Sequence, residues 1–139
     1  MFLKKRGQVS FEYLAIFGIA SLMIIPLMII FAHQSSSIEA DVAYAQAESA
    51  LSRIVASAEE VYFQGPPARK TLSVHFPKGV REVLIEESSI VFVLETVDGE
   101  FNIYKDTSAR LSGSLESFEG PHIVVFEASE GLVTLAEKS

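Results

Sequence analysis

The chain of 139 residues contains no cysteine and a single asparagine, Asn102. Without cysteine it can form no disulfide, no thiolate nucleophile and no cysteine-ligated metal site. Asn102 is followed by Ile103 and Tyr104, which do not complete an N-glycosylation sequon. A folded domain in this chain must therefore be held together by packing alone.

Basic residues are also scarce. The sequence has 11 Lys and Arg against 18 Asp and Glu, a formal net charge of −7. Lys4, Lys5 and Arg6 lie together near the start, and the other basic residues are scattered along the chain. Binding to a phosphate backbone requires clustered Lys and Arg. The composition therefore argues against nucleic acid as a partner.

Residues that could carry catalysis are few and dispersed. His33, His75 and His122 are far apart, and none has a metal-ligand neighbour at a helical or hairpin spacing. We place His75 and His122 opposite the apolar positions of their strands, which predicts exposed imidazoles. The paired carboxylates at residues 59–60 and 86–87 point in different directions on any element and are interpreted as solvated. No nucleophile elbow or glycine-rich phosphate loop is present, so we predict no enzyme, no metal site and no cofactor.

A long apolar run lies near the start of the chain. Residues 13–32 carry no charge and would form a helix of about 30 Å, enough to cross a bilayer. Basic residues flank only its N-terminal end, which predicts a cytoplasmic N-terminus. A secretory signal is cut after its apolar run at small residues in an A-x-A-like pattern, and no such pattern follows Ala32. We therefore expect the mature protein to keep this helix.

The helical pattern continues beyond the apolar run. Apolar or small residues recur in steps of three and four, as on one face of a helix, at Ile38, Val42, Ala45, Leu51, Ile54, Val55, Ala58, Val61 and Tyr62. The run Gly65-Pro66-Pro67 predicts that the helix ends near Gln64. A helix over residues 8–64 would be on the order of 85 Å long. We expect Pro26 to kink or loosen it, and residues 35–37, all serine, to be a second weak point.

After Pro67 the apolar pattern changes to a period of two, which indicates strands. The expected strands cover residues 72–76, 80–85, 89–97, 101–103, 122–128 and 132–135. Residues 89–97 are apolar on both faces, as in a central strand. Asp98-Gly99 predicts a two-residue hairpin and residues 129–131 a second one. The sequence thus predicts an α+β fold with a mostly antiparallel sheet of about five or six strands, covered by helix residues 51–62.

The residues around the start of the apolar run form a recognisable motif. Lys5-Arg6-Gly7 is followed by Gln8, Ser10, Glu12 and Leu14 in a Q-x-S-x-E-x-L pattern. This arrangement resembles the class III signal peptide of archaeal type IV pilin-like proteins. The resemblance implies cleavage by a prepilin peptidase after Gly7, with recognition of Lys5, Arg6, Ser10, Glu12 and Leu14. It divides the chain into a leader (1–7), a long helix (8–64) and a β-rich domain (65–139), as in type IV pilins.

Glu12 is costly in this position. A carboxylate within the hydrocarbon costs roughly 2.5–3.5 kcal/mol on insertion scales. The resemblance implies a partner for it, the α-amino group that cleavage frees on Gln8 of a neighbouring subunit. The spacing agrees, because Gln8 and Glu12 are one turn apart, about 6 Å along the axis. Cyclisation of Gln8 to pyroglutamate would remove that amine.

The resemblance also implies how the protein is used. Identical subunits would form a helical filament through contacts made by Gln8, Phe11, Glu12, Leu14, Phe17 and Pro26. The precursor would lie in the archaeal cell membrane, and an assembly ATPase with a membrane platform would move it into an extracellular surface filament, for adhesion. The prepilin peptidase and the membrane before assembly are the other expected partners.

Alternatives to a major filament subunit stay open. One is a minor pilin or pseudopilin of an adhesion or secretion machine. Another is an archaellin, although these usually lack the Q-x-S-x-E-x-L pattern after the cut. A third is an uncleaved, membrane-anchored extracellular binding domain. An enzyme is the last alternative.

Overall fold

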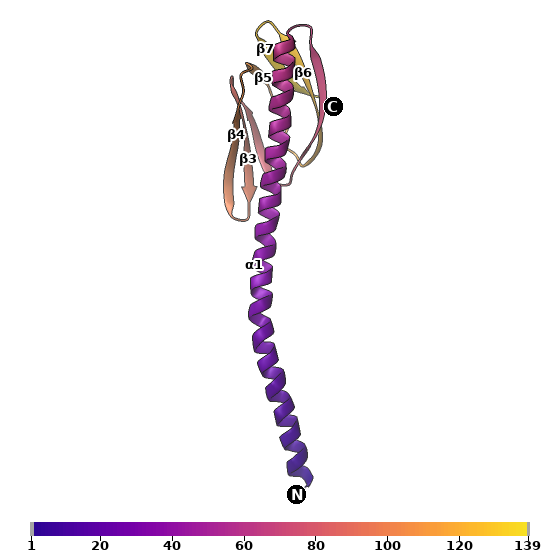
Figure 1. Ribbon diagram of the computed structural model, residues 1–139, viewed down its shortest axis with the longest axis vertical. Helices are drawn as coiled ribbons and strands as arrows, with labels where there is room; N and C mark the ends of the chain where they lie inside the picture. Colours follow the sequence, from indigo (N-terminus) through magenta and orange to yellow (C-terminus); the bar gives the residue numbers. More distant parts are fainter. Residues whose placement is uncertain (1, 139) are drawn as a thin grey trace. The chain divides into compact units, whose positions relative to one another are not determined.

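The computed structural model describes residues 2–138, with the side chains of residues 7–35 and 37–138. This part of the chain forms one helix followed by strands (Figure 1). The elements are α1 (Phe2–Gln64), β1 (Arg69–Phe76), β2 (Val80–Ile85), β3 (Ser89–Thr96), β4 (Gly99–Asp106), β5 (Leu111–Gly113), β6 (Gly120–Ser129) and β7 (Leu132–Glu137). The α+β arrangement predicted from the sequence is confirmed.

Helix α1 ends at Gln64, as the Gly65-Pro66-Pro67 run predicted. Gly65 has a φ of 71°, a left-handed conformation suited to glycine, and its N–H donates to the carbonyl of Val61 at 3.2 Å. The helix begins at Phe2 rather than at Gln8, so it includes the expected leader. It is also unbroken at Pro26 and at residues 35–37.

The chain divides into two compact units, one reaching Ile38 and the other starting at Glu39. The second part of α1 therefore belongs to the same unit as the strands. The structural boundary lies within the helix, whereas the sequence analysis placed the start of the β-rich domain after Gln64. Packing of the helix against the strands explains this difference.

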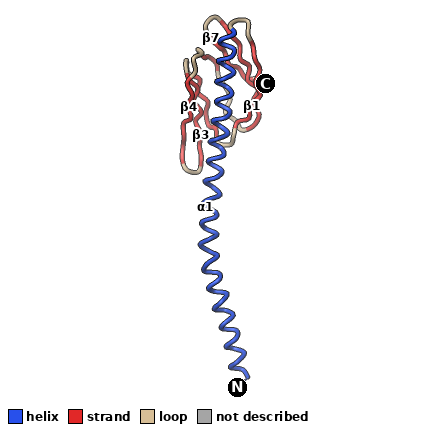
Figure 2. The backbone as a smooth tube through the Cα atoms, in the orientation of Figure 1, coloured by secondary structure: helices blue, strands red, loops and turns tan. Residues whose placement is uncertain are grey.

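The strands form two sheets rather than the single sheet expected (Figure 2). One has the order β1-β6-β7-β5 and the other the order β2-β3-β4, so β3 is central as predicted. All pairings are antiparallel except β5 with β7. The hairpin between β3 and β4 turns at Val97 and Asp98, one residue earlier than expected, and Gly99 begins β4. The predicted hairpin between β6 and β7 is confirmed.

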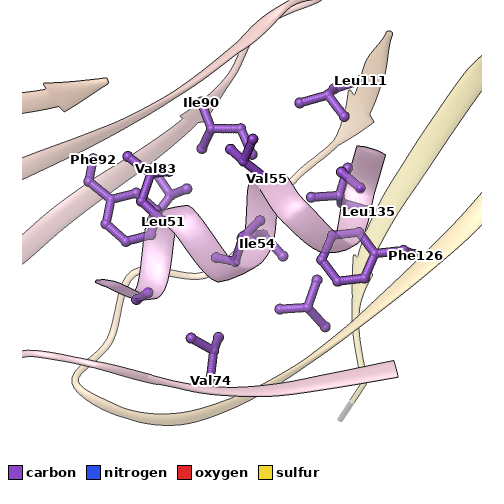
Figure 3. Packing of buried hydrophobic residues seen from close by; sticks show 14 of the residues in the cluster. Leu51, Ile54, Val55, Val74, Val83, Ile90, Phe92, Leu111, Phe126 and Leu135 are labelled. Atoms are coloured by element: carbon purple, nitrogen blue, oxygen red, sulfur yellow. The ribbon is translucent and has the colours of Figure 1, made fainter. Parts of the chain in front are cut away.

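The second half of α1 packs on both sheets (Figure 3). Its buried apolar residues are Ala47, Ala50, Leu51, Ile54, Val55, Ala58 and Val61. They share one apolar core with Val83, Ile90 and Phe92 of one sheet and Phe126 and Leu135 of the other. Each fully buried large side chain stabilises the fold by about 1.5–3 kcal/mol. The helix therefore joins two sheets that share no strand, which confirms its expected covering role.

Polar contacts fix the position of α1 against the strands. The Glu59 carboxylate accepts hydrogen bonds from Thr107 Oγ1 and from the backbone N–H of Ser108, both at 3.1 Å. Lys105 Nζ donates to Ser52 Oγ at 2.7 Å. Glu59 is half-buried, so the expectation that it is simply solvated was wrong.

Candidate functional site

The apolar segment of α1, residues 13–32, is exposed at every position except the half-buried Ser21. Phe11, Leu14 and Phe17 have exposed fractions of 72%, 67% and 65%. In the described part of the chain, α1 is the one helix long and apolar enough to cross a membrane. Because each large apolar side chain left in water forgoes about 1.5–3 kcal/mol, this surface favours an apolar environment, such as a bilayer or other apolar helices. It is the main candidate for a functional surface.

Glu12 is the only charged residue between Gly7 and Ala32. Glu12 and Gln8 are both exposed on α1, one turn apart on the same side of the helix. Within the part of the chain that the structure describes, Glu12 forms no hydrogen bond or ion pair. A carboxylate in this position is available to a group from outside the chain.

Gly7 lies in the helix without any steric need for glycine. A Cβ at Gly7 would meet no atom within 4 Å, and its φ is not positive. Glycine inside a helix costs about 1 kcal/mol relative to alanine. No contact in the described chain accounts for a glycine at this position. Ser10 is exposed nearby, whereas the side chains of Lys5 and Arg6 lie outside those that the structure describes.

The helix around Pro26 presents a shallow, almost wholly apolar groove. It is lined by Ile24, Leu27, Met28, Phe31 and Ala32. Because Pro26 has no N–H, the carbonyl of Leu22 lacks its helical hydrogen bond at this point. The groove is a surface into which side chains of another apolar helix can pack.

One of the two strand histidines was placed wrongly. His75 is exposed, as predicted, but His122 is buried, with an exposed fraction of 1%. His122 is in phase with Val124 and Phe126, which face the core, so its position along β6 already indicated burial. The sequence analysis assigned it to the opposite phase.

His122 is held on four sides. Its Nδ1 lies 2.6 Å from Glu137 Oε1, and its Nε2 donates to the carbonyl of Phe118 at 2.6 Å. The rings of Phe76 and Phe118 stack on its two faces, with centroids at 3.9 and 4.1 Å. Glu137 Oε2 also accepts the N–H of Glu116 at 3.0 Å. This cluster fastens the loop between β5 and β6 to β7, which is a structural role.

The described residues contain no group of three or more His, Asp or Glu side chains placed to hold a metal ion. No buried side-chain nitrogen or oxygen among them lacks a hydrogen-bond partner. Glu12 and the exposed apolar surface around it therefore remain the strongest candidate site.

Comparison of the chain with family models, curated proteins and solved structures finds no match. The functional interpretation therefore depends on the residues of α1 and of the β-rich unit themselves.

Proposed function

We propose that this chain is a structural subunit of an archaeal type IV pilus-like surface filament, used for adhesion. The observation that carries the proposal is an exposed apolar helix segment whose one carboxylate, Glu12, has no partner in the described chain. The Q-x-S-x-E-x-L pattern places that carboxylate in register with Gln8, after Lys5-Arg6-Gly7. A helix of this kind joined to a folded β-rich unit suits a subunit that polymerises through its helix.

Processing would precede assembly. A membrane-bound prepilin peptidase hydrolyses the bond between Gly7 and Gln8, leaving a carboxylate on Gly7 and a free α-amino group on Gln8. Glycine before the cut allows close approach of the peptidase to the scissile backbone. The open space around Gly7 supports this interpretation, because no contact within the described chain accounts for the glycine.

Assembly would then bury the apolar segment among its copies. An ATPase and a membrane platform deliver the subunit, and the Gln8 amine of one copy pairs with Glu12 of another. Pairing removes much of the cost of placing each charge in an apolar bundle and sets the stagger between helices, a well-supported use of buried ion pairs. Phe11, Leu14 and Phe17 supply apolar contacts, and the groove near Pro26 receives side chains from neighbouring helices.

A second candidate is a membrane-anchored extracellular binding domain that is never cut. The same apolar segment supports it, since one such helix is sufficient as an anchor. A minor pilin or pseudopilin would share the processing of a major subunit but would be rare in purified filaments.

The deciding experiment is the mass of the N-terminal peptide from protein sheared off the cell surface. A chain that begins at Gln8 in this fraction supports the filament subunit, and loss of ammonia from that peptide would reveal cyclisation. A chain that begins at Met1 and stays in the membrane contradicts it and favours the anchored domain.

A matched pair of variants sharpens the test. Gly7→Val should block cleavage, whereas Gly18→Val, in an equally open position of the same helix, should be cut normally. Equal cleavage of both variants would remove Gly7 from the processing site.

A further inference from the structure

Two strands form the outer flanks of the β-rich unit. β5 and β2, the inner edges of the two sheets, lie near each other, and the N–H of Leu111 donates to the carbonyl of Glu87 where the sheets adjoin. The strand order therefore leaves β1 at one flank and β4 at the other. Figure 2 shows them on opposite sides of α1.

These flanking strands are long and regular. Each has eight residues without proline, and their pairings with β6 and β3 run without a bulge. By contrast, β2 has an irregularity between Val80 and Glu82, and β5 has only three residues. Proteins usually protect exposed strand edges with proline, bulges or short strands, because unpaired backbone groups can pair with another chain. β1 and β4 lack those features, although both carry charged residues, which are a further protection against unspecific pairing.

The unpaired backbone groups can be identified from the register. The N–H of Ala128 donates to the carbonyl of Ala68, so alternate β1 residues from that point bond to β6. This leaves the backbone groups of Arg69, Thr71, Ser73 and His75 pointing away from the sheet. The N–H of Thr107 donates to the carbonyl of Ser88, so alternate β4 residues from that point bond to β3. This leaves unpaired the backbone groups of Glu100, Asn102, Tyr104 and Asp106 on β4. In the part of the chain that the structure describes, no strand pairs with either set.

The two edges run in opposite directions at the same level of the unit. β1 starts beside the end of α1, where Lys70 forms an ion pair with Glu60. β4 finishes at that same level, where Thr107 donates to Glu59. When two copies stand side by side with their α1 segments parallel, β1 of one copy is antiparallel to β4 of the next. Little axial shift is then needed to align them.

We propose that β4 of one copy pairs with β1 of a second copy as antiparallel strands, with Arg69 opposite Asp106. The register then places Thr71 opposite Tyr104, Ser73 opposite Asn102 and His75 opposite Glu100. Every free position of one edge meets a free position of the other.

Charge complementarity supports this register. Arg69 and Asp106 form no ion pair in the described part of the chain. Glu100 already has Arg81 at 3.5 Å, which makes the pair of Arg69 with Asp106 the sharper test. In the pairing between copies, two unpartnered opposite charges come together at one end of the new ladder.

The contact joins two different surfaces of the same chain, so it does not close on itself in a dimer and can extend to further copies. The inference rests on the proposed filament, in which apolar helices hold the copies parallel. The β-rich units would then form a sheath of continuous sheet around the bundled helices.

Cysteine cross-linking of the full chain tests the register, because the native sequence has no competing thiol. Ser73 and Asn102 would face each other with Cα atoms about 5.5 Å apart, a separation that a disulfide spans. Ser73→Cys with Asn102→Cys should give a reducible ladder of covalent multimers on oxidation. Ser73→Cys with Glu100→Cys is the control, because diagonal neighbours about 7–8 Å apart cannot be bridged without backbone movement.

Charge reversal tests the pair at the end of the ladder. In the cross-linking background, Arg69→Glu should reduce multimer yield about fivefold, the upper range for one exposed ion pair. Adding Asp106→Arg should restore the yield. A reduction that Asp106→Arg does not reverse would contradict the proposed pairing of these residues.

The outcomes separate this inference from the filament proposal. If filaments form from subunits that begin at Gln8 but the Ser73→Cys/Asn102→Cys variant gives no ladder, the strand pairing alone is overturned. The same holds if the diagonal control, Ser73→Cys with Glu100→Cys, gives as much ladder as that variant. A ladder from uncut chains in the membrane supports the pairing and contradicts the filament. Uncut chains without a ladder contradict both.

Discussion

Glu12 lies one helical turn from Gln8 in a segment of α1 that carries no other charge. Glu12 belongs to the motif expected for recognition, but Lys5, Arg6, Gly7, Ser10 and Leu14 stay in place in Glu12→Ala. We predict that this variant is still largely cleaved but suppresses filament formation, because the Gln8 amine would enter the bundle unpaired. Breaking a buried ion pair costs about 3 kcal/mol or more, which corresponds to about a hundredfold in each contact. The measurement is filament mass in the sheared fraction against the processed subunit left in the membrane.

Glu39→Ala is the matched control for this prediction. Glu39 is an exposed carboxylate on the same helix, beyond the apolar segment, so its loss should leave filament yield unchanged. Normal filaments from Glu12→Ala would remove the carboxylate from the assembly mechanism.

His122 provides a second test at the scale of one residue. His122→Ala would leave a gap between Phe76 and Phe118 and remove the hydrogen-bond partner of Glu137 Oε1. We expect a loss of about 3 kcal/mol in the free energy of unfolding, since a cavity and an unsatisfied polar group both contribute. Thermal unfolding of the detergent-solubilised chain measures it.

His75→Ala, on the neighbouring strand, is the control for His122. Its side chain is exposed, so the effect on stability should stay within about 0.5 kcal/mol. Similar losses for the two variants would contradict the structural role assigned to His122.

At the scale of the element, leucine side chains are buried in one part of α1 and exposed in the other. Leu51 is 1% exposed in the core of the β-rich unit, whereas Leu22 is 74% exposed in the apolar segment. Leu51→Ala should destabilise that unit by about 2–5 kcal/mol through the cavity it leaves. Leu22→Ala should not change the unit's stability. Urea unfolding of the detergent-solubilised chain, followed by circular dichroism, compares them, and an equal response would contradict this division of the helix.

Local chemistry explains which elements could be predicted from the sequence. Gly65 with two following prolines predicted the end of α1, and alternation on both sides of residues 129–131 predicted the hairpin of β6 and β7. β3 was predicted from a run of residues that is apolar on both faces. Alternation reports which face a side chain occupies but not which strands are neighbours, so the division into two sheets was missed. β5 was missed because it has three residues and pairs in parallel with the distant β7.

The features of the candidate sites also differ in whether local sequence signals could reveal them. Glu12 was identifiable from the sequence because a charge in an apolar run is a local signal. The two free strand edges were not, because they depend on sheet order and on hydrogen bonds between residues far apart in the chain. The burial of His122 could have been predicted from the sequence, since His122 is in phase with the apolar Val124 on the same strand.

For the whole molecule, the position of the core predicts which part of the chain folds alone. All residues of the apolar core lie between Ala47 and Leu135, within the unit that starts at Glu39. We therefore expect a fragment of residues 39–139 to fold cooperatively without detergent. The measurement is thermal unfolding with amide hydrogen exchange, and rapid exchange of the amides in β3 and β6 would contradict the prediction.

The association of that fragment separates the two proposed contacts. One pairing of eight-residue edges is marginal in water, as an isolated pair of strands is, whereas helices bundled in a filament would hold the edges at high effective concentration. The fragment should therefore be monomeric at micromolar concentration in sedimentation velocity, although the full chain assembles. A fragment that polymerised unaided would mean that strand pairing drives assembly and that the apolar helix only anchors it. A monomer agrees with the opposite order, in which helix bundling drives assembly and strand pairing follows.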